Sequence, residues 1–289
     1  MNQSPGAQFR ELLQQPPLAI PGVFNALVAK MAERIGFKAV YQSGAALSAG
    51  LAALPDVGLI TMSEFTASAR YLVEAVSVPV ISDADTGFGE PLAVERCVQA
   101  YESAGLAGLH LEDQQMPKRC GHLSGKTLVG IDEMTAKLQA AASARRDPDF
   151  VIIARTDARG VNGLDDALER AKAYVDAGAD VIFPEALKTP EEFQTFANEI
   201  SVPLIANMTE FGQSPLLSAD ELAGLGFAAV LFPVTTLRSA MKAVEQMLTE
   251  IMNTGTQAGQ LENMQSRKEL YELLGYENFD QRDRSYFEQ

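Results

Sequence analysis

The segment AGLAGLHLED (residues 104–113) follows the same plan as three others, IGFKAVYQSG (35–44), AGADVIFPEA (177–186) and LGFAAVLFPV (225–234). Each has a glycine at its second position. An amphipathic stretch, such as LDDALERAKAYVDA, precedes each of them. A glycine at that point ends a helix in the left-handed conformation, and the short apolar run after it is typical of a buried parallel strand. Each segment therefore predicts the end of a helix followed by a strand.

Four further segments complete a set of eight strands: LAIPGVFN (18–25), SVPVISDAD (77–85), FVIIARTDA (150–158) and SVPLIANMT (201–209). The expected centres are near residues 20, 41, 81, 110, 153, 182, 205 and 231. Strands that alternate with helices, joined by right-handed crossovers, favour a (β/α)8 TIM barrel of the α/β class. An open doubly wound sheet is the alternative, but no G-x-G-x-x-G motif follows the first strand.

The whole chain of 289 residues is expected to form one domain. The barrel should cover about 16–235 and a helical extension about 236–289. In the extension, TTLRSAMKAVEQMLTEIM and SRKELYELLG predict two helices, which is more than the single helix that a barrel needs to close. We therefore expect the extra helix to pack on a neighbouring subunit.

Charge excludes several classes of partner. The chain has 23 Lys and Arg against 38 Asp and Glu, a net charge of −15, which is the wrong sign for nucleic acid or an anionic membrane. The N-terminal stretch lacks the features of a secretory signal, and no run approaches about 18 apolar residues, so we expect a cytoplasmic protein. An anionic substrate would need a local cluster of cations.

Acidic residues gather where the predicted strands end. Asp83 and Asp85 stand two apart on one strand, so their carboxylates share a face, and Glu112 ends the next strand. Oxygen ligands without Cys or His suit Mg²⁺, with Mn²⁺ as an alternative. An aspartate-capped turn at the strand end is the simpler alternative.

The segment QQMPKRCGHLSGK (114–126) predicts a mobile loop after the fourth strand. Lys118, Arg119 and His122 surround Cys120 in the sequence and are expected to lower the pKa of its thiol toward neutrality. Such a thiol could give or take a proton; an unreactive surface cysteine is the alternative. His110 is expected to be a hydrogen-bonded core residue rather than a ligand.

Cations for an anionic ligand can also be identified. Arg155 ends the fifth strand, Arg238 follows the eighth, and Arg267 precedes the last predicted helix. The planar guanidinium suits carboxylates, so the expected ligand is a di- or tricarboxylate, with ordinary solvation of Arg238 and Arg267 as the alternative.

Several motifs resemble those of the isocitrate lyase and phosphoenolpyruvate mutase superfamily. They are YQSGA (41–45), LPD (54–56), SDADTGFGE (82–90), LEDQ (111–114), KRCGH (118–122), ARTDA (154–158), FPEA (183–186) and NMTE (207–210). The resemblance runs from about residue 10 to 275 and is strongest toward its methylisocitrate-cleaving branch. Ala45 stands where many relatives carry a second glycine.

The resemblance implies an Mg²⁺-dependent cleavage of 2-methylisocitrate to pyruvate and succinate, by a barrel whose last helix is exchanged within a homotetramer, a dimer of dimers. It places Cys120 and Arg155 in catalysis and Asp83, Asp85 and Glu112 at the metal. Tyr41, Asp56 and Glu185 are the alternatives for the catalytic base that takes the hydroxyl proton. Substrate would contact Ser43, Gly44, Ala45, Gly121, His122, Glu185, Asn207, Thr209, Arg238 and Arg267. The substrate's methyl group would meet Phe183, Leu231 and Pro233.

Two alternatives remain open. The same scaffold carries other chemistries, such as oxaloacetate decarboxylation, isocitrate cleavage or phosphonate rearrangement. A catalytically silent barrel that serves as a binding module is the alternative of a different class.

Overall fold

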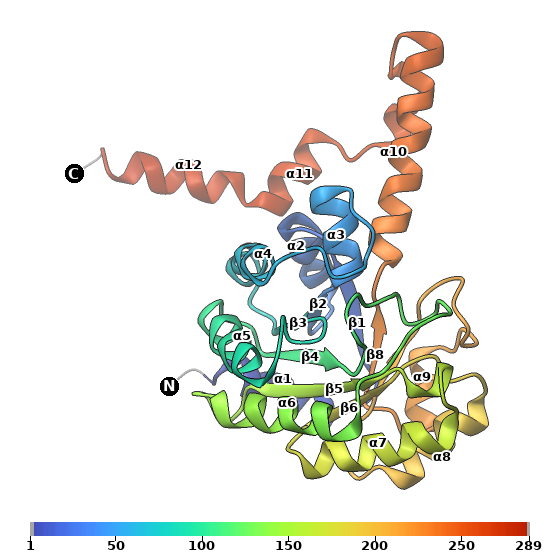
Figure 1. Cartoon of the computed structure of the whole chain (residues 1–289). Coiled ribbons are helices and arrows are strands. Elements are labelled where there is room, and N and C mark those ends of the chain that lie inside the picture. Colours follow the sequence, from blue (N-terminus) through green and yellow to red (C-terminus); the bar gives the residue numbers. More distant parts are fainter. Residues whose placement is uncertain (1–2, 288–289) are drawn as a thin grey trace.

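The computed structural model describes residues 3–287 and contains eight parallel strands, each followed by at least one helix (Figure 1). The strands are β1 (Leu18–Val23), β2 (Val40–Gln42), β3 (Val80–Asp83), β4 (Gly108–Glu112), β5 (Val151–Thr156), β6 (Val181–Pro184), β7 (Ile205–Asn207) and β8 (Ala229–Phe232). They pair in the order β6-β5-β4-β3-β2-β1-β8-β7. Each lies where the sequence predicts a strand.

The sheet closes between its two edge strands. Ile182 and Leu204 form a parallel bridge, and the Ile182 N–H donates to the Pro203 carbonyl at 3.1 Å. This closure confirms the (β/α)8 barrel and excludes the open doubly wound sheet.

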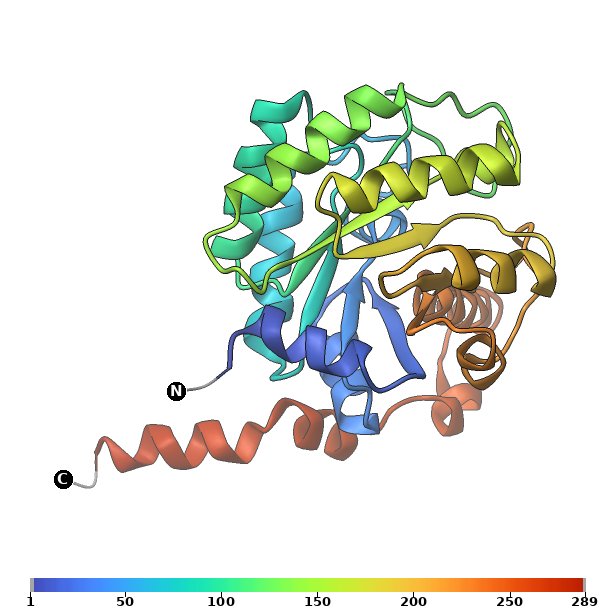
Figure 2. The same cartoon turned by 90° about the horizontal axis from the view of Figure 1, so that it is seen from below.

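Most of the helices pack around the barrel (Figure 2). They are α1 (Pro5–Leu13), α2 (Ala26–Ile35), α3 (Gly44–Ala52), α4 (Met62–Ala75), α5 (Pro91–Ser103), α6 (Ile131–Ala144), α7 (Leu164–Asp176), α8 (Pro190–Glu199), α9 (Ala219–Gly224), α10 (Thr235–Thr254), α11 (Arg267–Leu274) and α12 (Tyr276–Ser285). The four repeat glycines, Gly36, Gly105, Gly178 and Gly226, have φ between 89° and 116°. A side chain would strain this conformation, which explains why the repeats carry glycine there.

Two apolar layers position the mouth of the barrel. Inside it, Ile20, Ile81, Ile153 and Leu231 pack together, and α1 contributes Phe9 from the end where the strands begin. A second layer joins the outer faces of the strands to the surrounding helices. The carboxyl ends of the strands are left to carry polar groups.

The C-terminal helices lie largely outside the barrel. Helix α10 projects away from it, and α11 and α12 run back past α2 (Figure 1). Sequence analysis predicts only two helices here; α12 is the third, a polar segment with weak apolar periodicity. No helix among residues 3–287 combines the length and apolar character that a membrane span requires.

Candidate active site

A cavity of about 90 Å³ lies at the carboxyl ends of the strands. Its lining includes most of the residues that the sequence nominates: Tyr41, Ser43, Ala45, Asp56, Asp83, Cys120, Gly121, His122, Arg155, Glu185, Asn207, Thr209 and Arg238. The cavity is also lined by four apolar residues: Phe183, Leu231, Pro233 and Val234. The barrel therefore brings residues from the ends of six strands and from two loops together around a single chamber.

Three other nominated residues lie beside the cavity. The Gly44 N–H donates to Asp83 Oδ2 at 3.3 Å, and a Cβ on Gly44 would stand 2.5 Å from that oxygen. Glu112 lies within 3.2 Å of the Arg155 guanidinium. Asp85 faces Lys118 and borders a second cavity. Glycine at position 44 thus allows the backbone to approach Asp83.

Arg267 is not brought to this cavity within one chain. It is the first residue of α11, an exposed helix that packs near α2. The placement of Arg267 at the substrate is therefore not reproduced by a single chain.

Arg155 is the central cation of the site. Its Nε lies 3.0 Å from Asp157 Oδ2, and its other nitrogens lie 3.2 Å from Glu112 and 3.8 Å from Glu185. Burial alone would lower the pKa of Arg155, but these three carboxylates outweigh it and raise the pKa well above the usual value. Arg155 is therefore a fixed positive charge, and its guanidinium also stacks over the Phe183 ring at 5.3 Å.

Glu185 joins the site to the loop that covers it. Its carboxylate accepts hydrogen bonds from Asn207 Nδ2 at 3.1 Å and lies 3.1 Å from His122 Nε2. Burial would raise the pKa of Glu185, but the charge of Arg155 and the contacts with His122 and Asn207 hold it well below the usual range. Glu185 is therefore ionised and unsuited to act as a base near neutral pH.

His110 lies beneath the cavity rather than in it. Its Nε2 is 2.7 Å from the Tyr41 hydroxyl and 3.5 Å from Asp83 Oδ1, while its buried Nδ1 has no hydrogen-bond partner among the described residues. The expectation of a core histidine is right, but only one of its nitrogens is satisfied. Burial lowers the pKa of His110, so the ring is neutral.

The carboxylates have the chemistry of a divalent-cation site. Both Glu112 oxygens are buried and accept no hydrogen bond within residues 3–287. Burial raises the pKa of Glu112 well above its usual value. Apart from the Arg155 guanidinium at 3.2 Å, these oxygens can be satisfied by a bound cation or by its water, so the donor set of Asp83, Asp85 and Glu112 fits Mg²⁺.

The carboxylates are not preassembled around a common point. Within the described part of the chain, no three Asp, Glu, His or Cys groups converge tightly enough to hold an ion. Lys118 instead places its ammonium between Asp85, at 2.7 Å, and Asp56. Burial and the nearby charge of Asp83 raise the pKa of Asp85 to about 7. A divalent ion would have to share or displace the Lys118 ammonium.

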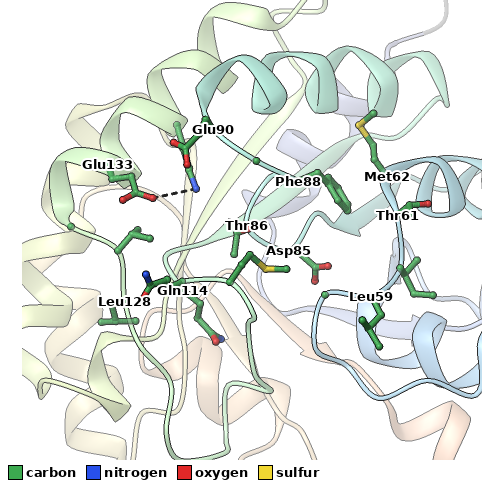
Figure 3. Close-up of a pocket in the computed structure, with 18 residues that line it drawn as sticks. Leu59, Thr61, Met62, Asp85, Thr86, Phe88, Glu90, Gln114, Leu128 and Glu133 are labelled. Atoms are coloured by element: carbon green, nitrogen blue, oxygen red, sulfur yellow. Dashed lines mark ion pairs between the residues drawn. The ribbon is translucent and has the colours of Figure 1, made fainter.

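Asp85 also borders a larger cavity of about 860 Å³ (Figure 3). In this view Asp85 lies between the segment that carries Leu59 and Thr61 and the segment that carries Gln114 and Leu128. The far side holds an ion pair between Glu133 and Lys137 at 3.6 Å. Asp85 therefore lines the larger cavity, whereas Asp83, two residues earlier, lines the smaller one.

A lid loop, residues 115–127, closes over the smaller cavity. Its stem is fixed where Gln114 pairs with Leu128 and the Gln115 N–H donates to the Thr127 carbonyl at 2.8 Å. At its tip, His122 accepts a hydrogen bond at Nδ1 from the Gln213 N–H at 2.8 Å. The structure thus shows the lid in contact with the β7–α9 loop.

The lid corrects the expectation for Cys120. Its nominated cations point elsewhere: Lys118 pairs with Asp56 and Asp85, His122 faces Glu185, and Arg119 is exposed and points toward the Ser124 carbonyl. Cys120 is exposed as a residue, but the groups around its thiol partly desolvate it and raise the pKa of Cys120 above its ordinary 9.0. The backbone N–H of His122 only partly offsets this. The thiol is therefore expected to be protonated at neutral pH. The other cysteine, Cys97, is buried in α5.

Gly121 sets how closely the lid approaches the site. A Cβ here would stand 2.2 Å from Glu185 Oε1 and 2.4 Å from Arg155 Nη2. We expect Gly121→Ala to lower kcat about 10²-fold, because misplacing catalytic groups by about 1 Å has that effect. Gly224→Ala, in a helix with open space around the glycine, is the matched control. Equal steady-state rates in the two variants would contradict this role.

Comparisons with known proteins agree with this geometry. The model of the phosphoenolpyruvate phosphomutase family matches residues 9–252. The 2-methylisocitrate lyase of Aeropyrum pernix is 51% identical over 97% of this chain and 91% of the relative. The probable 2-methylisocitrate lyase 1 of Corynebacterium glutamicum is 54% identical over 96% of this chain and 92% of the relative.

Solved structures extend the comparison. An oxaloacetate acetylhydrolase bound to the inhibitor 3,3-difluorooxalacetate superposes with a TM-score of 0.92, at 34% identity, over 98% of this chain and 97% of that chain. A phosphonopyruvate hydrolase bound to oxalate and Mg²⁺ gives 0.89 at 34% identity, over 99% and 100%. With its barrel, its lid and these matches, the chain belongs to the phosphoenolpyruvate phosphomutase family.

Proposed function

We propose that this chain cleaves 2-methylisocitrate to pyruvate and succinate. The observation that carries the proposal is the convergence of the Cys120 thiol, the Arg155 guanidinium and the carboxylates of Asp83 and Glu185 on one cavity. Relatives named 2-methylisocitrate lyase at 51% and 54% identity support the substrate. Phe183, Leu231 and Pro233 supply an apolar wall suited to the methyl group.

A divalent cation belongs to the proposal. Asp83, Asp85 and Glu112 would hold Mg²⁺, or Mn²⁺ in its place, which would supply Lewis-acid polarisation of the substrate's hydroxyl and carboxylate oxygens. Arg155 and Arg238 are the cations that line the cavity and would bind the remaining carboxylates. Ser43, Ala45 and Thr209 offer polar and backbone contacts at its rim.

The base that takes the hydroxyl proton is assigned by elimination. Burial and the charge of Asp83 raise the pKa of Tyr41 well above 10.0, so its hydroxyl stays protonated. Glu185 is too weak a base for the reason given above. Asp56 is the carboxylate that lines the cavity and is assigned neither to the metal nor to Arg155, so we assign the base role to Asp56.

The bond changes then balance. Asp56 takes the hydroxyl proton, the C–O bond becomes the carbonyl of pyruvate, and the C–C bond breaks. Its electron pair passes to the succinate carbon, where the adjacent carboxylate delocalises it. Cys120 gives its proton to that carbon and is left as a thiolate, a general-acid step of about 10²- to 10⁴-fold. The lid excludes water while the carbanion exists.

Relative rates test this proposal. We expect kcat/KM to be highest for 2-methylisocitrate, followed by pyruvate release. For isocitrate, followed by glyoxylate release, kcat/KM should be at least about tenfold lower, because one methyl group in an apolar pocket contributes about 1–3 kcal/mol. Pyruvate release from oxaloacetate should also have a lower kcat/KM. A higher kcat/KM for oxaloacetate would instead favour the alternative chemistry of the same scaffold. The absence of turnover with all three substrates would favour a binding module.

Assembly is a second part of the proposal. The exposed side chains of Met241, Val244, Leu248 and Met252 lie at helical spacing on α10, which projects away from the barrel (Figure 1). We propose that this stripe packs on a second copy, with exchanged helices in a dimer of dimers. The exchange would also carry Arg267 toward a neighbouring cavity.

Light scattering measures the assembly directly. We expect a tetramer for the chain and a smaller species for Leu248→Glu, since a buried unpaired charge breaks an apolar interface. Lys242→Glu, a change of an exposed side chain on the same helix, is the control. A monomer at micromolar concentration would contradict the exchange.

A further inference from the structure

We propose that Lys126 is a positioning residue: its ammonium latches the lid loop to the carboxylate that orients Arg155. The inference rests on the proposed function, because it assigns the latch a part in that reaction. It concerns a residue near the C-terminal end of the lid, six positions after Cys120.

The contacts of Lys126 define the latch. Its side chain is 2% exposed, although the lid around it is largely exposed. The ammonium donates to Asp157 Oδ1 at 2.8 Å and to the Gly121 carbonyl. One charged group therefore bridges the lid tip and the end of β5.

Asp157 transmits this contact to Arg155. The Asp157 carboxylate accepts from Arg155 Nε at 3.0 Å and from Nη2 at 3.2 Å. Its Oδ1 is thus shared between Lys126 and Arg155. The Asp157 backbone N–H donates to Asp113 Oδ1 at 2.9 Å, which fixes Asp157 from behind. The Asp157 carboxylate therefore both holds the closed lid, through Lys126, and orients the Arg155 guanidinium.

The surrounding backbone leaves space for this ammonium. A Cβ on Gly160 would stand 3.3 Å from Lys126 Nζ, closer than most real contacts. A buried ammonium is unfavourable unless its hydrogen bonds are satisfied, and here both acceptors belong to the site. In an open lid, the Gly121 carbonyl would leave this position and Lys126 would lose one of its two partners.

The consequence is a coupling between lid closure and catalysis. Gly121 follows Cys120 directly, so a contact that fixes the Gly121 carbonyl also limits where the thiol can point. When the latch is absent, substrate can still bind Arg155 and Arg238, but the thiol should sample positions away from the reacting carbon. The loss is expected in kcat rather than in KM.

The test combines kinetics with thiol accessibility. For Lys126→Met, we expect kcat to fall about 10- to 100-fold with KM changed less than about threefold. In the parent protein, pyruvate, succinate and Mg²⁺ should slow the reaction of Cys120 with an aromatic disulfide reagent. In Lys126→Met that protection should be largely lost. Both measurements are made in a Cys97→Ala background, so that Cys120 is the thiol that reacts with the reagent.

Two variants keep the test decisive. Lys172→Met removes an exposed lysine paired with Glu199 at 2.7 Å and should change neither quantity. Lys126→Arg retains the charge and should restore part of both kcat and protection. If Lys126→Met does not fold, Lys126→Gln, which is polar and neutral, replaces it.

The possible results separate the two proposals. An active parent protein together with full thiol protection in Lys126→Met would overturn the latch. A parent protein that is inactive on 2-methylisocitrate yet shows latch-dependent protection would overturn the proposed substrate and leave the latch standing. A kcat loss accompanied by an equal loss in Lys172→Met would also contradict a specific role for Lys126.

Discussion

Cys120→Ser lowers kcat about 10²- to 10⁴-fold and leaves the protein folded, if the thiol is the general acid. A serine hydroxyl has nearly the same size but is a far weaker acid, so the carbanion would have to take its proton from elsewhere. Cys120 borders the cavity in an exposed loop and contributes little to the core. Steady-state turnover and a thermal unfolding curve measure the two halves of this prediction.

Cys97→Ala is the matched control for this substitution. Cys97 is buried in α5, away from the cavity, and burial together with Asp85 raises its pKa above any value relevant to catalysis. We expect Cys97→Ala to keep its turnover, with at most a modest loss of stability. Turnover by Cys120→Ser within a factor of two of the parent would remove the thiol from the mechanism.

The same assignment fixes the sign of the pH dependence. Because burial raises the pKa of Cys120 above 9.0, the acid form that donates the proton persists through neutral pH. The alkaline fall in kcat should therefore lie above 9.0 and should disappear from the residual activity of Cys120→Ser. An alkaline fall near neutral pH would instead agree with the original expectation of a lowered pKa.

Asp85→Asn is expected to cause a comparable loss of turnover for a different reason. It removes a charged oxygen ligand and leaves Lys118 with only Asp56 as an ion-pair partner. We expect the apparent affinity for Mg²⁺ to fall about 10- to 100-fold and kcat to fall at saturating metal. Calorimetric titration with Mg²⁺ alone measures binding independently of turnover.

Asp176→Asn provides the control for charge. Asp176 is exposed at the last residue of α7, so its substitution makes the same chemical change away from the site. The Mg²⁺ affinity of Asp176→Asn should equal that of the parent protein. Unchanged affinity in Asp85→Asn would remove Asp85 from the cation site.

Much of the fold is predictable because its signals are local. A left-handed glycine before a short apolar run is a property of a few adjacent residues, and four of the eight strand centres follow from it. The other four follow from short apolar runs without that glycine. The strand-end side chains, including Asp83, Glu112 and Arg155, are then placed at one mouth by the barrel itself. Helix α12 lacks a strong apolar pattern and was missed for that reason.

The lid is different because its side-chain directions depend on distant partners. Lys118 turns to Asp56, 62 residues away in sequence, and Lys126 turns to Asp157, 31 residues away. Counting charges near Cys120 in the sequence therefore gives the wrong sign for its pKa shift. Lys126 carries no sequence signal beyond its charge, so its burial can be seen only in the folded chain.

The most direct test of the mechanism is a crystal structure determined with Mg²⁺, pyruvate and succinate. We predict an ion held by Asp83 and Asp85, directly or through water, with the Cys120 sulfur within contact distance of a succinate methylene carbon. An ion bound elsewhere, or a closed lid whose thiol faces away from both products, would contradict the account.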